Sequence, residues 1–337
     1  MRHKMLRRTL MSRVGVLVLA AVLLTAGAAA AQGPVAMVYD AVADSGFGEM
    51  AVLGGERAAR DFGVNVAVVV ADSPSEYAST LRGLAASREH DVIIAVGFPF
   101  AEAIALVAGE FPEQDFALID AEVEAPNVMN VVFAEHEGGA LAGALAAFIA
   151  LESGSDTVGI VLGMDVPPLR RFAAGYEWGA RWAAERYSER NPARPSPATV
   201  KVLAEYTGSF SNPELGKKAA LAQLEKGAAV IFNAAGATGL GVFEAVREAA
   251  QADGRHVGPP FAVGVDSIQE YIAPGFVPAS VVKRVDTGVY AIVERALSGT
   301  FAGGTLRLDL KSGGLGLSTS GAVDELLEFA VGERLLD

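Results

Sequence analysis

The sequence predicts an α/β protein with two similar lobes, each built on a parallel sheet that helices cover on both faces. From Val35 onward, short apolar runs alternate with amphipathic segments, and this alternation occurs in two successive series. Alternating strands and helices are typical of parallel, doubly covered sheets. The 337 residues are 51% hydrophobic and only 20% charged, so the chain is long and apolar enough for two cores.

Each series contains five predicted strands. Those of the first are residues 35–39, 64–70, 92–96, 116–119 and 129–133, separated by helical segments such as 48–62 and 76–86. Those of the second are residues 158–162, 200–203, 228–232, 261–265 and 279–282. An Ala- and Leu-rich helix over 138–151 is expected to begin the second lobe, and 279–284 to cross back to the first. The predicted division is 32–134 with about 284–300 for lobe I, 135–283 for lobe II, and 301–337 as a C-terminal segment that crosses between the lobes and packs on them.

The first 31 residues have the pattern of a secretory signal peptide. Five Lys and Arg side chains precede an apolar run over 14–30, and small residues at Ala29 and Ala31 fit cleavage before Gln32. The alternative is an uncleaved membrane anchor, but a comfortable span needs about 20 apolar residues. The sequence therefore predicts an exported protein.

Charge and cysteine content narrow the possible partners. The leader carries five positive charges and no negative ones, so the net charge of −13 becomes −18 for the mature chain. Such a surface repels nucleic acid and anionic membranes. The absence of cysteine excludes disulfides, thiol catalysis and a lipid attached to a cysteine at the cleavage site. We therefore expect a soluble periplasmic or otherwise extracytoplasmic protein that is not lipid-anchored through cysteine.

A glycine-rich turn follows the predicted strand 228–232. The loop 233–239 contains Gly236 and Gly239, and a helix is expected from Leu240, with Thr238 able to cap it. Glycines let backbone amides approach a ligand closely, and ligands of open α/β sheets bind outside the carboxyl ends of strands. The alternative is that these glycines only permit a tight turn.

Acidic residues follow four predicted strands: Asp40, Asp120, Asp165 and Asp266. A carboxylate accepts hydrogen bonds, which suits the vicinal hydroxyls of a sugar. Each acid alone is also an ordinary turn or helix-capping residue. Because the carboxyl ends of parallel strands meet at one edge, we interpret the group as a binding site for a small polar ligand.

Catalytic and metal chemistry are not indicated. Glu135, His136 and Glu137 resemble metal ligands, but histidine is too scarce elsewhere for a usual ligand set, so we expect neither a metal nor another cofactor. The spacing 236–241 misses the G-x-G-x-x-G fingerprint of dinucleotide binding, and no G-x-S-x-G elbow is present. We expect a binding protein and not an enzyme, although an exported enzyme is the alternative class.

The helix that follows the Met164 turn leaves one question open. Arg170, Arg171 and Phe172 either line the cleft or form a solvated helix start, since arginine is usually exposed. Tyr176, Trp178 and Trp182, further along the same helix, are expected to be packing residues of the second lobe.

Five blocks of sequence, in order, resemble the basic membrane protein (BMP/PnrA-like) family of ABC transporter substrate-binding proteins, whose characterised members include purine nucleoside receptors. The blocks are PNVMNVVFAEHEGGALAGALAAF, VGIVLGMDVPPLRRFAAGYEWGA, YTGSFSNPELGKKAALAQLEKGAAVIFNAAGATGLGVFEA, FAVGVDSIQEYIAPG and ASVVKRVD. The resemblance implies a type I periplasmic-binding-protein fold, in which two doubly wound parallel-sheet lobes joined by a three-strand hinge close over a nucleoside. It also implies a membrane permease as partner and a monomeric state.

The resemblance also implies roles for individual side chains. Phe210 matches the aromatic that stacks on one face of the base, and Phe47, near Asp40, best matches the opposing one. The ribose hydroxyls are expected to be held at four further positions: Asp120, Gly239, Asp266 and Lys283. With Asp40, these make seven expected ligand-binding residues for adenosine, guanosine or inosine.

One departure from the family pattern concerns the base. The loop after the first strand is short and has Gly48 where the family has an asparagine that addresses the base edge. Asp44, Ser45 or Glu49 is a candidate substitute. The alternative within the same class is a receptor for a free sugar or another small polar metabolite, for which Phe47 and Phe210 would not both contact the ligand.

Overall fold

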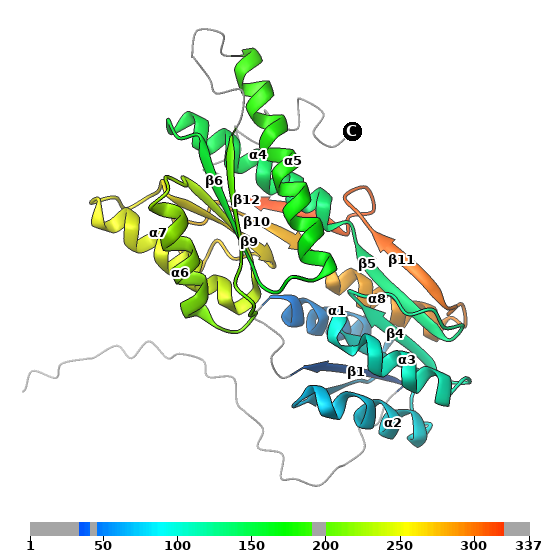
Figure 1. Cartoon of the computed structure of the whole chain (residues 1–337). Coiled ribbons are helices and arrows are strands. Elements are labelled where there is room, and N and C mark those ends of the chain that lie inside the picture. Colours follow the sequence, from blue (N-terminus) through cyan, green and yellow to red (C-terminus); the bar gives the residue numbers. More distant parts are fainter. Residues whose placement is uncertain (1–33, 41–45, 191–199, 320–337) are drawn as a thin grey trace, which may run out of the picture. The chain divides into compact units, whose positions relative to one another are not determined.

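Two six-stranded sheets form the framework of the protein. The computed structural model describes residues 34–40, 46–190 and 200–319. Three parts of the sequence predictions therefore lie outside the described residues: the signal peptide, the candidate residues Asp44 and Ser45, and residues 320–337 of the C-terminal segment. The α/β prediction with two mainly parallel sheets is confirmed (Figure 1).

The first sheet has the strand order β11-β5-β4-β3-β1-β2, and all its pairings are parallel. Its strands are β1 (Val35–Asp40), β2 (Val66–Ala71), β3 (Val92–Val96), β4 (Asp115–Ile119), β5 (Val128–Phe133) and β11 (Gly304–Leu308). Its helices are α1 (Phe47–Phe62), α2 (Tyr77–Ser87), α3 (Ala101–Glu110) and α8 (Val285–Leu297), with short 3₁₀ turns η1 (Pro74–Glu76) and η2 (Phe98–Phe100).

Alternate residues of these strands enter two different cores. Val35 and Met37 pack with α1 and α8, whereas Ala36 and Val38 pack with α2 and α3 on the opposite face. Successive side chains of a strand point to opposite faces, so a strand covered on both sides is apolar at every position. This explains why continuous apolar runs, and not alternating ones, marked the strands in the sequence.

The second sheet has the strand order β12-β10-β9-β8-β6-β7, with β12 antiparallel to β10 and the other pairings parallel. Its strands are β6 (Thr157–Leu162), β7 (Lys201–Tyr206), β8 (Val230–Ala234), β9 (Phe261–Asp266), β10 (Ala279–Lys283) and β12 (Leu315–Thr319). Its helices are α4 (Glu135–Glu152), α5 (Pro167–Arg190), α6 (Pro213–Leu224) and α7 (Leu240–Ala252), with η3 (Gly236–Gly239) before α7.

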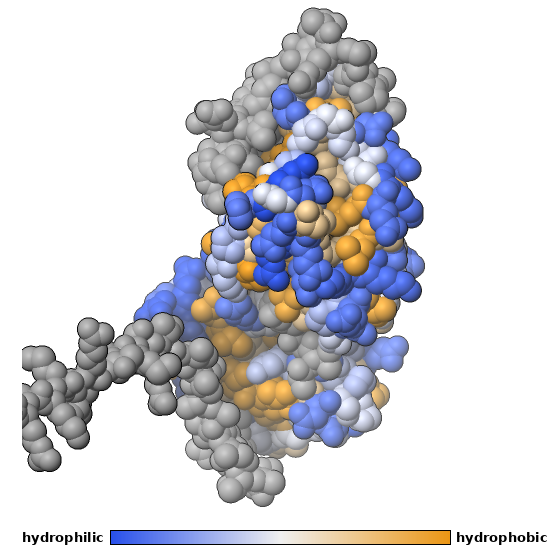
Figure 2. All heavy atoms as spheres, turned by 90° about the vertical axis from the view of Figure 1, so that its left-hand side faces the viewer, coloured by the Kyte–Doolittle hydropathy of each residue, from blue (hydrophilic) through white to orange (hydrophobic). Residues whose placement is uncertain are grey.

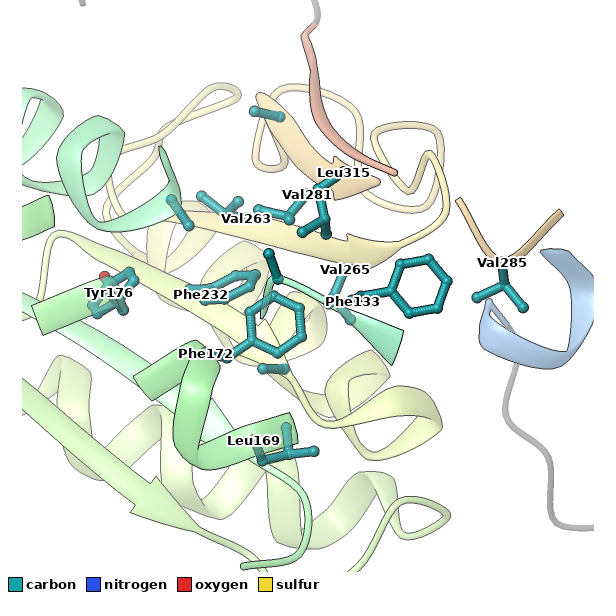
Figure 3. Close-up of a cluster of buried hydrophobic side chains, with 14 of the residues drawn as sticks. Phe133, Leu169, Phe172, Tyr176, Phe232, Val263, Val265, Val281, Val285 and Leu315 are labelled. Carbon is teal, nitrogen blue, oxygen red and sulfur yellow. The ribbon is translucent and has the colours of Figure 1, made fainter. Parts of the chain in front are cut away.

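A layer of aromatic and branched side chains joins α5 to the second sheet. Figure 3 shows Phe172 and Tyr176 of α5 against Phe232 of β8, beside Val263 and Val281. The Tyr176 and Phe232 rings are stacked at 5.8 Å between centroids, and Phe172 meets Phe232 edge-on at 5.7 Å. The predicted packing role is confirmed for Tyr176, which has no exposed surface, and for Trp182, which packs against this core, but it is wrong for Trp178, which is 47% exposed.

The chain passes between the two sheets three times, because β5 leads through α4 to β6, β10 leads through α8 to β11, and β11 leads directly to β12. The strands β11 and β12 therefore place the last described part of the chain on both sheets. On the face shown in Figure 2, hydrophilic side chains are spread over the surface and hydrophobic ones lie in patches between them.

Helices α4 and α5 approach each other closely through glycine. A Cβ at Gly143 of α4 would lie 2.0 Å from the carbonyl oxygen of Tyr176, and one at Gly179 of α5 would lie 2.1 Å from that of Ala140. Gly139 and Gly175 stand in the same position toward the partner helix. The glycines therefore set the spacing of this helix pair, since any larger residue would push the backbones apart.

Replacing Gly143 by alanine is expected to destabilise the fold by about 2–3 kcal/mol, because overpacking a close interface costs more than alanine gains in helix propensity. Gly83→Ala in α2 is the matched control, because a Cβ there would meet nothing within 4 Å. That change should stabilise the protein by about 0.5–1 kcal/mol. Urea unfolding of both variants tests this, and equal stability of the two would contradict the role given to Gly143.

Candidate ligand-binding site

A cavity of about 350 Å³ lies where the carboxyl ends of strands from both sheets meet. This volume is within the range of small-molecule sites. Six of the seven residues predicted from the sequence line it: Asp40, Phe47, Asp120, Phe210, Asp266 and Lys283. The other lining residues are mostly apolar, among them Phe98, Met164, Leu169 and Phe172.

Asp120 and Asp266 occupy equivalent places in the two sheets. Asp120 follows β4 and Asp266 ends β9, and each of these strands is third in its sheet. Both residues have left-handed backbones, with φ of 74° and 65°. Such a conformation is uncommon outside glycine and is enriched at functional sites. The same turn therefore presents one carboxylate to the cavity from each sheet.

Lys283 lies between three acids at the end of β10. Its Nζ donates a hydrogen bond to Oδ1 of Asp120 at 2.5 Å and forms an ion pair with Oε1 of Glu135 at 3.0 Å. The Lys283 side chain is only 2% exposed and that of Glu135 is fully buried. On its other oxygen, Glu135 accepts a hydrogen bond from Nε of Arg171 at 2.6 Å. Charges of alternating sign thus run inward from Arg171 to the cavity.

Burial and charge act in opposite directions on these groups. Burial alone would lower the pKa of the Lys283 ammonium, but the charges of Asp120, Glu135 and Asp266 together raise it above its ordinary value. Burial would raise the pKa of the Glu135 carboxyl, yet Lys283 and Arg171 hold that pKa below its usual range. Burial raises the pKa of the Asp120 carboxyl, with the Lys283 charge opposing the rise.

Aromatic rings form the wall of the cavity. The Phe210 and Phe98 rings lie 6.2 Å apart between centroids and are inclined at 59°. Gly163 makes room for Phe210, because a Cβ there would lie 2.2 Å from the ring. The Phe47 ring centroid is 5.3 Å from the Lys283 ammonium. Sequence reasoning missed Phe98, although Gly97-Phe98-Pro99 directly follows the strand 92–96.

Asp40 is held by a tyrosine at the start of α2. The Tyr77 hydroxyl donates a short hydrogen bond to an Asp40 carboxylate oxygen, and the Tyr77 ring stacks on Phe100 at 4.1 Å. Burial, together with the Asp40 carboxylate, raises the pKa of the Tyr77 hydroxyl. The packed Tyr77 ring therefore fixes this carboxylate at the cavity edge.

Gly239 and Thr238 have other positions than the sequence suggested. Gly239 is buried outside the cavity lining, where its Cα lies against the Asn233 side chain, and Gly236 lines the cavity instead. The expectation that Thr238 caps α7 is wrong. Its hydroxyl donates to the Ser209 carbonyl and accepts from the Asn212 amide, so Thr238 secures the loop that carries Phe210.

The other side chains considered from the sequence are engaged elsewhere. Asp165 pairs with Arg170 at 2.6 Å on the surface and does not line the cavity. Neither alternative for Arg171 holds, because its side chain reaches inward to Glu135. Within the described ranges, no group of three or more His, Cys, Asp or Glu side chains could hold a metal ion. No helix in the part of the chain that the structure describes is long and apolar enough to cross a membrane.

A family model described as ABC transporter substrate-binding protein PnrA-like (Bmp) matches residues 34–332. The chain belongs to this family. The resemblance inferred from the five sequence blocks is thereby confirmed, and so is the transport role of the chain as an ABC transporter substrate-binding protein.

Three relatives show how far the likeness of this PnrA-like protein extends. An uncharacterized lipoprotein of Pyrococcus abyssi is 38% identical over 289 residues, covering 85% of this chain and 69% of the relative. The ABC transporter nucleoside-binding protein BmpA of Lactococcus lactis is 29% identical over 266 residues, covering 76% and 71%. A solute-binding protein of an ABC transporter from Aeropyrum pernix has a similar solved structure, with TM-score 0.75, 36% identity, and coverage of 90% and 81%.

One expectation from the sequence requires correction. We predicted a soluble exported protein that is not lipid-anchored through cysteine, but the Pyrococcus abyssi relative and those of two further Pyrococcus species are named lipoproteins. The prediction rested on the absence of cysteine from the sequence. An absent acceptor residue excludes only one chemical route of attachment, so it did not justify predicting an unanchored protein.

Proposed function

We propose that this PnrA-like substrate-binding protein binds a nucleoside, most favourably a purine nucleoside, and delivers it to the permease of an ABC transporter. The observation that carries the proposal is the composition of the cavity. Aromatic and aliphatic side chains form most of its lining, while three carboxylates, those of Asp40, Asp120 and Asp266, and the Lys283 ammonium lie at the strand ends. A nucleoside matches both parts of this lining, because its flat base suits the aromatic side chains and the adjacent hydroxyls of its sugar suit the charged groups.

In this proposal, Phe210 and Phe47 stack on the base and Asp40 faces its edge. Asp120, Asp266 and Lys283 hold the ribose hydroxyls, and Gly239 acts indirectly by giving Asn233 its place behind the loop. Base stacking on an aromatic ring contributes about 1–3 kcal/mol, and a hydrogen bond to a charged group about 1.5–3 kcal/mol. After the cost of association, these contributions allow dissociation constants in the micromolar range or below.

We propose that binding is coupled to closure of two lobes, comprising residues 32–134 with about 284–300 and residues 135–283. The three crossings between the sheets would serve as the hinge. Closure buries the ligand and presents a surface that the permease distinguishes from the open form, so the protein acts by capture and not by catalysis. The name of the Lactococcus lactis relative, a nucleoside-binding protein, supports the choice of ligand class.

Calorimetric titration tests the proposal. The chain from Gln32, freed of carried-over ligand by unfolding and refolding, is titrated with inosine, adenosine, guanosine, uridine, adenine and ribose. We expect one-to-one binding of a purine nucleoside and at least about 10-fold weaker binding of ribose, which lacks a base to stack. Binding of ribose alone, or of none of the panel, would overturn the nucleoside assignment and favour another small polar ligand.

A further inference from the structure

Glu135 and Arg171 have no place in the proposed contacts with the ligand, and neither lines the cavity. The carboxylate of Glu135 is nevertheless fully buried, and a buried charge is costly unless it is paired. Glu135 is the first residue of α4, directly after the first crossing, and Lys283 is the last residue of β10, directly before the second. Their ion pair thus lies where the chain passes between the sheets.

The contact between Lys283 and Glu135 is electrostatic. Glu135 Oε1 lies 3.0 Å from the ammonium nitrogen. The shorter contact of the ammonium is its hydrogen bond to Asp120, at 2.5 Å. An ammonium has three N–H donors, so Lys283 retains donor capacity for a ligand while acids on two sides hold its position.

Arg171 completes the charge balance. Its guanidinium is one third exposed and reaches Glu135 at 2.6 Å, so the buried carboxylate is shared between two cations. Without this second cation, Glu135 would draw the ammonium away from Asp120. Without Glu135, Lys283 would neutralise Asp120 alone and make it a weaker acceptor for a ligand hydroxyl.

We infer that Glu135 and Arg171 are positioning residues that determine how strongly Asp120 and Lys283 bind a vicinal diol. The inference rests on the proposed nucleoside function and adds two residues that never touch the ligand. They act through the Lys283 ammonium. Their contribution therefore appears only with ligands that have the diol.

The test compares inosine with 2′,3′-dideoxyinosine, which has the same base and no diol. Glu135→Gln keeps the shape of the side chain and removes its charge, and Arg171→Gln removes the charge of a partly exposed residue. For inosine we expect dissociation constants about 10-fold higher in Glu135→Gln and about 3- to 10-fold higher in Arg171→Gln. For the dideoxy ligand, at millimolar concentration, both variants should remain within about twofold of the wild type.

Arg170→Gln is the matched control. Arg170 precedes Arg171 and makes an equally short ion pair, but with exposed Asp165, so both affinities should stay within about twofold of the wild type. The double variant Glu135→Gln/Arg171→Gln should lose no more than Glu135→Gln alone, because the residues act in series.

Equal losses for both ligands would reveal a merely structural role and overturn the inference while wild-type inosine binding stands. Unchanged inosine affinity in both variants would also overturn it. If the wild-type protein bound no nucleoside, the proposed function would fail first and the inference with it.

Discussion

Replacing Lys283 by methionine is expected to lower the free energy of unfolding by about 3–5 kcal/mol at neutral pH, which is the usual cost of removing one partner from a buried ion pair. Methionine fills much of the same space but leaves Asp120 without its donor. Of the two cations that pair with Glu135 in the described structure, only Arg171 then remains. Urea unfolding of the ligand-free variant, followed by circular dichroism, measures the loss.

The loss should shrink as the pH falls. In the wild type, the pKa of Glu135 is held below its ordinary value, so its stabilisation is present above that value and disappears as the pH falls through the folded pKa. In the variant, the carboxyls that have lost the Lys283 charge should have raised pKa values. Their buried negative charges destabilise the fold at neutral pH, and protonation at lower pH removes this destabilisation. The two stability curves should therefore converge between pH 7 and pH 4.

Arg82→Met provides the comparison for this prediction. Arg82 forms a two-pronged ion pair with Glu110, but on the surface, where solvent screens such pairs. Arg82→Met should lose little stability at neutral pH, and its difference in free energy of unfolding from the wild type should not change as the pH falls. A Lys283→Met loss that is independent of pH would indicate poor packing of methionine and contradict the electrostatic explanation.

Eight of the ten predicted strands were recognisable because both faces of the sheet are covered there, which makes strands such as residues 92–96 apolar throughout. The other two, β2 and β7, are partly exposed edge strands. The two strands that were missed, β11 and β12, have no such signal. Their sequences, GTLRL and LGLST, are short and partly exposed, and each lies at the edge of its sheet. Pairing with β5 and β10, far away in the sequence, determines that these segments are strands.

Strand-end reasoning recovered much of the site, because a parallel sheet brings its carboxyl ends together. It could not separate Asp266, which lines the cavity, from Asp165, which pairs with Arg170 on the surface. That difference depends on side-chain partners and not on position in the strand. The partnership of Glu135 with Arg171 and Lys283 joins residues 36 and 148 positions away, and no local pattern marks it.

Backbone conformation distinguishes the two acids that a strand-end rule treats like any others. Asp120 and Asp266 are left-handed, whereas Asp165 has no such conformation. Aspartate and asparagine adopt this conformation more readily than other residues with a Cβ. At these positions the backbone conformation therefore favours aspartate or asparagine. It does not distinguish between the two, so we expect that ligand binding requires the carboxylate.

Replacing Asp266 by asparagine is accordingly expected to weaken nucleoside binding by about 2–3 kcal/mol, or about 30- to 150-fold, while the fold is retained. Asparagine tolerates φ near 65° and has the same shape, so the change removes the charge without straining the turn. Alanine would combine both effects and could not separate them. Calorimetric titration with inosine measures the affinity, and thermal unfolding without ligand checks the fold.

Asp165→Asn is the matched control, since it neutralises another acid at the end of a strand of the same sheet, outside the cavity lining. It should leave the inosine affinity within about twofold of the wild type. If the overall negative charge of the protein and not a particular carboxylate supported binding, neutralising either residue would weaken it. Loss of affinity in Asp266→Asn alone would instead locate the effect in the cavity, through contact with the ligand or through the Lys283 ammonium, on which the Asp266 charge acts. Near-normal binding by that variant would remove Asp266 from the site.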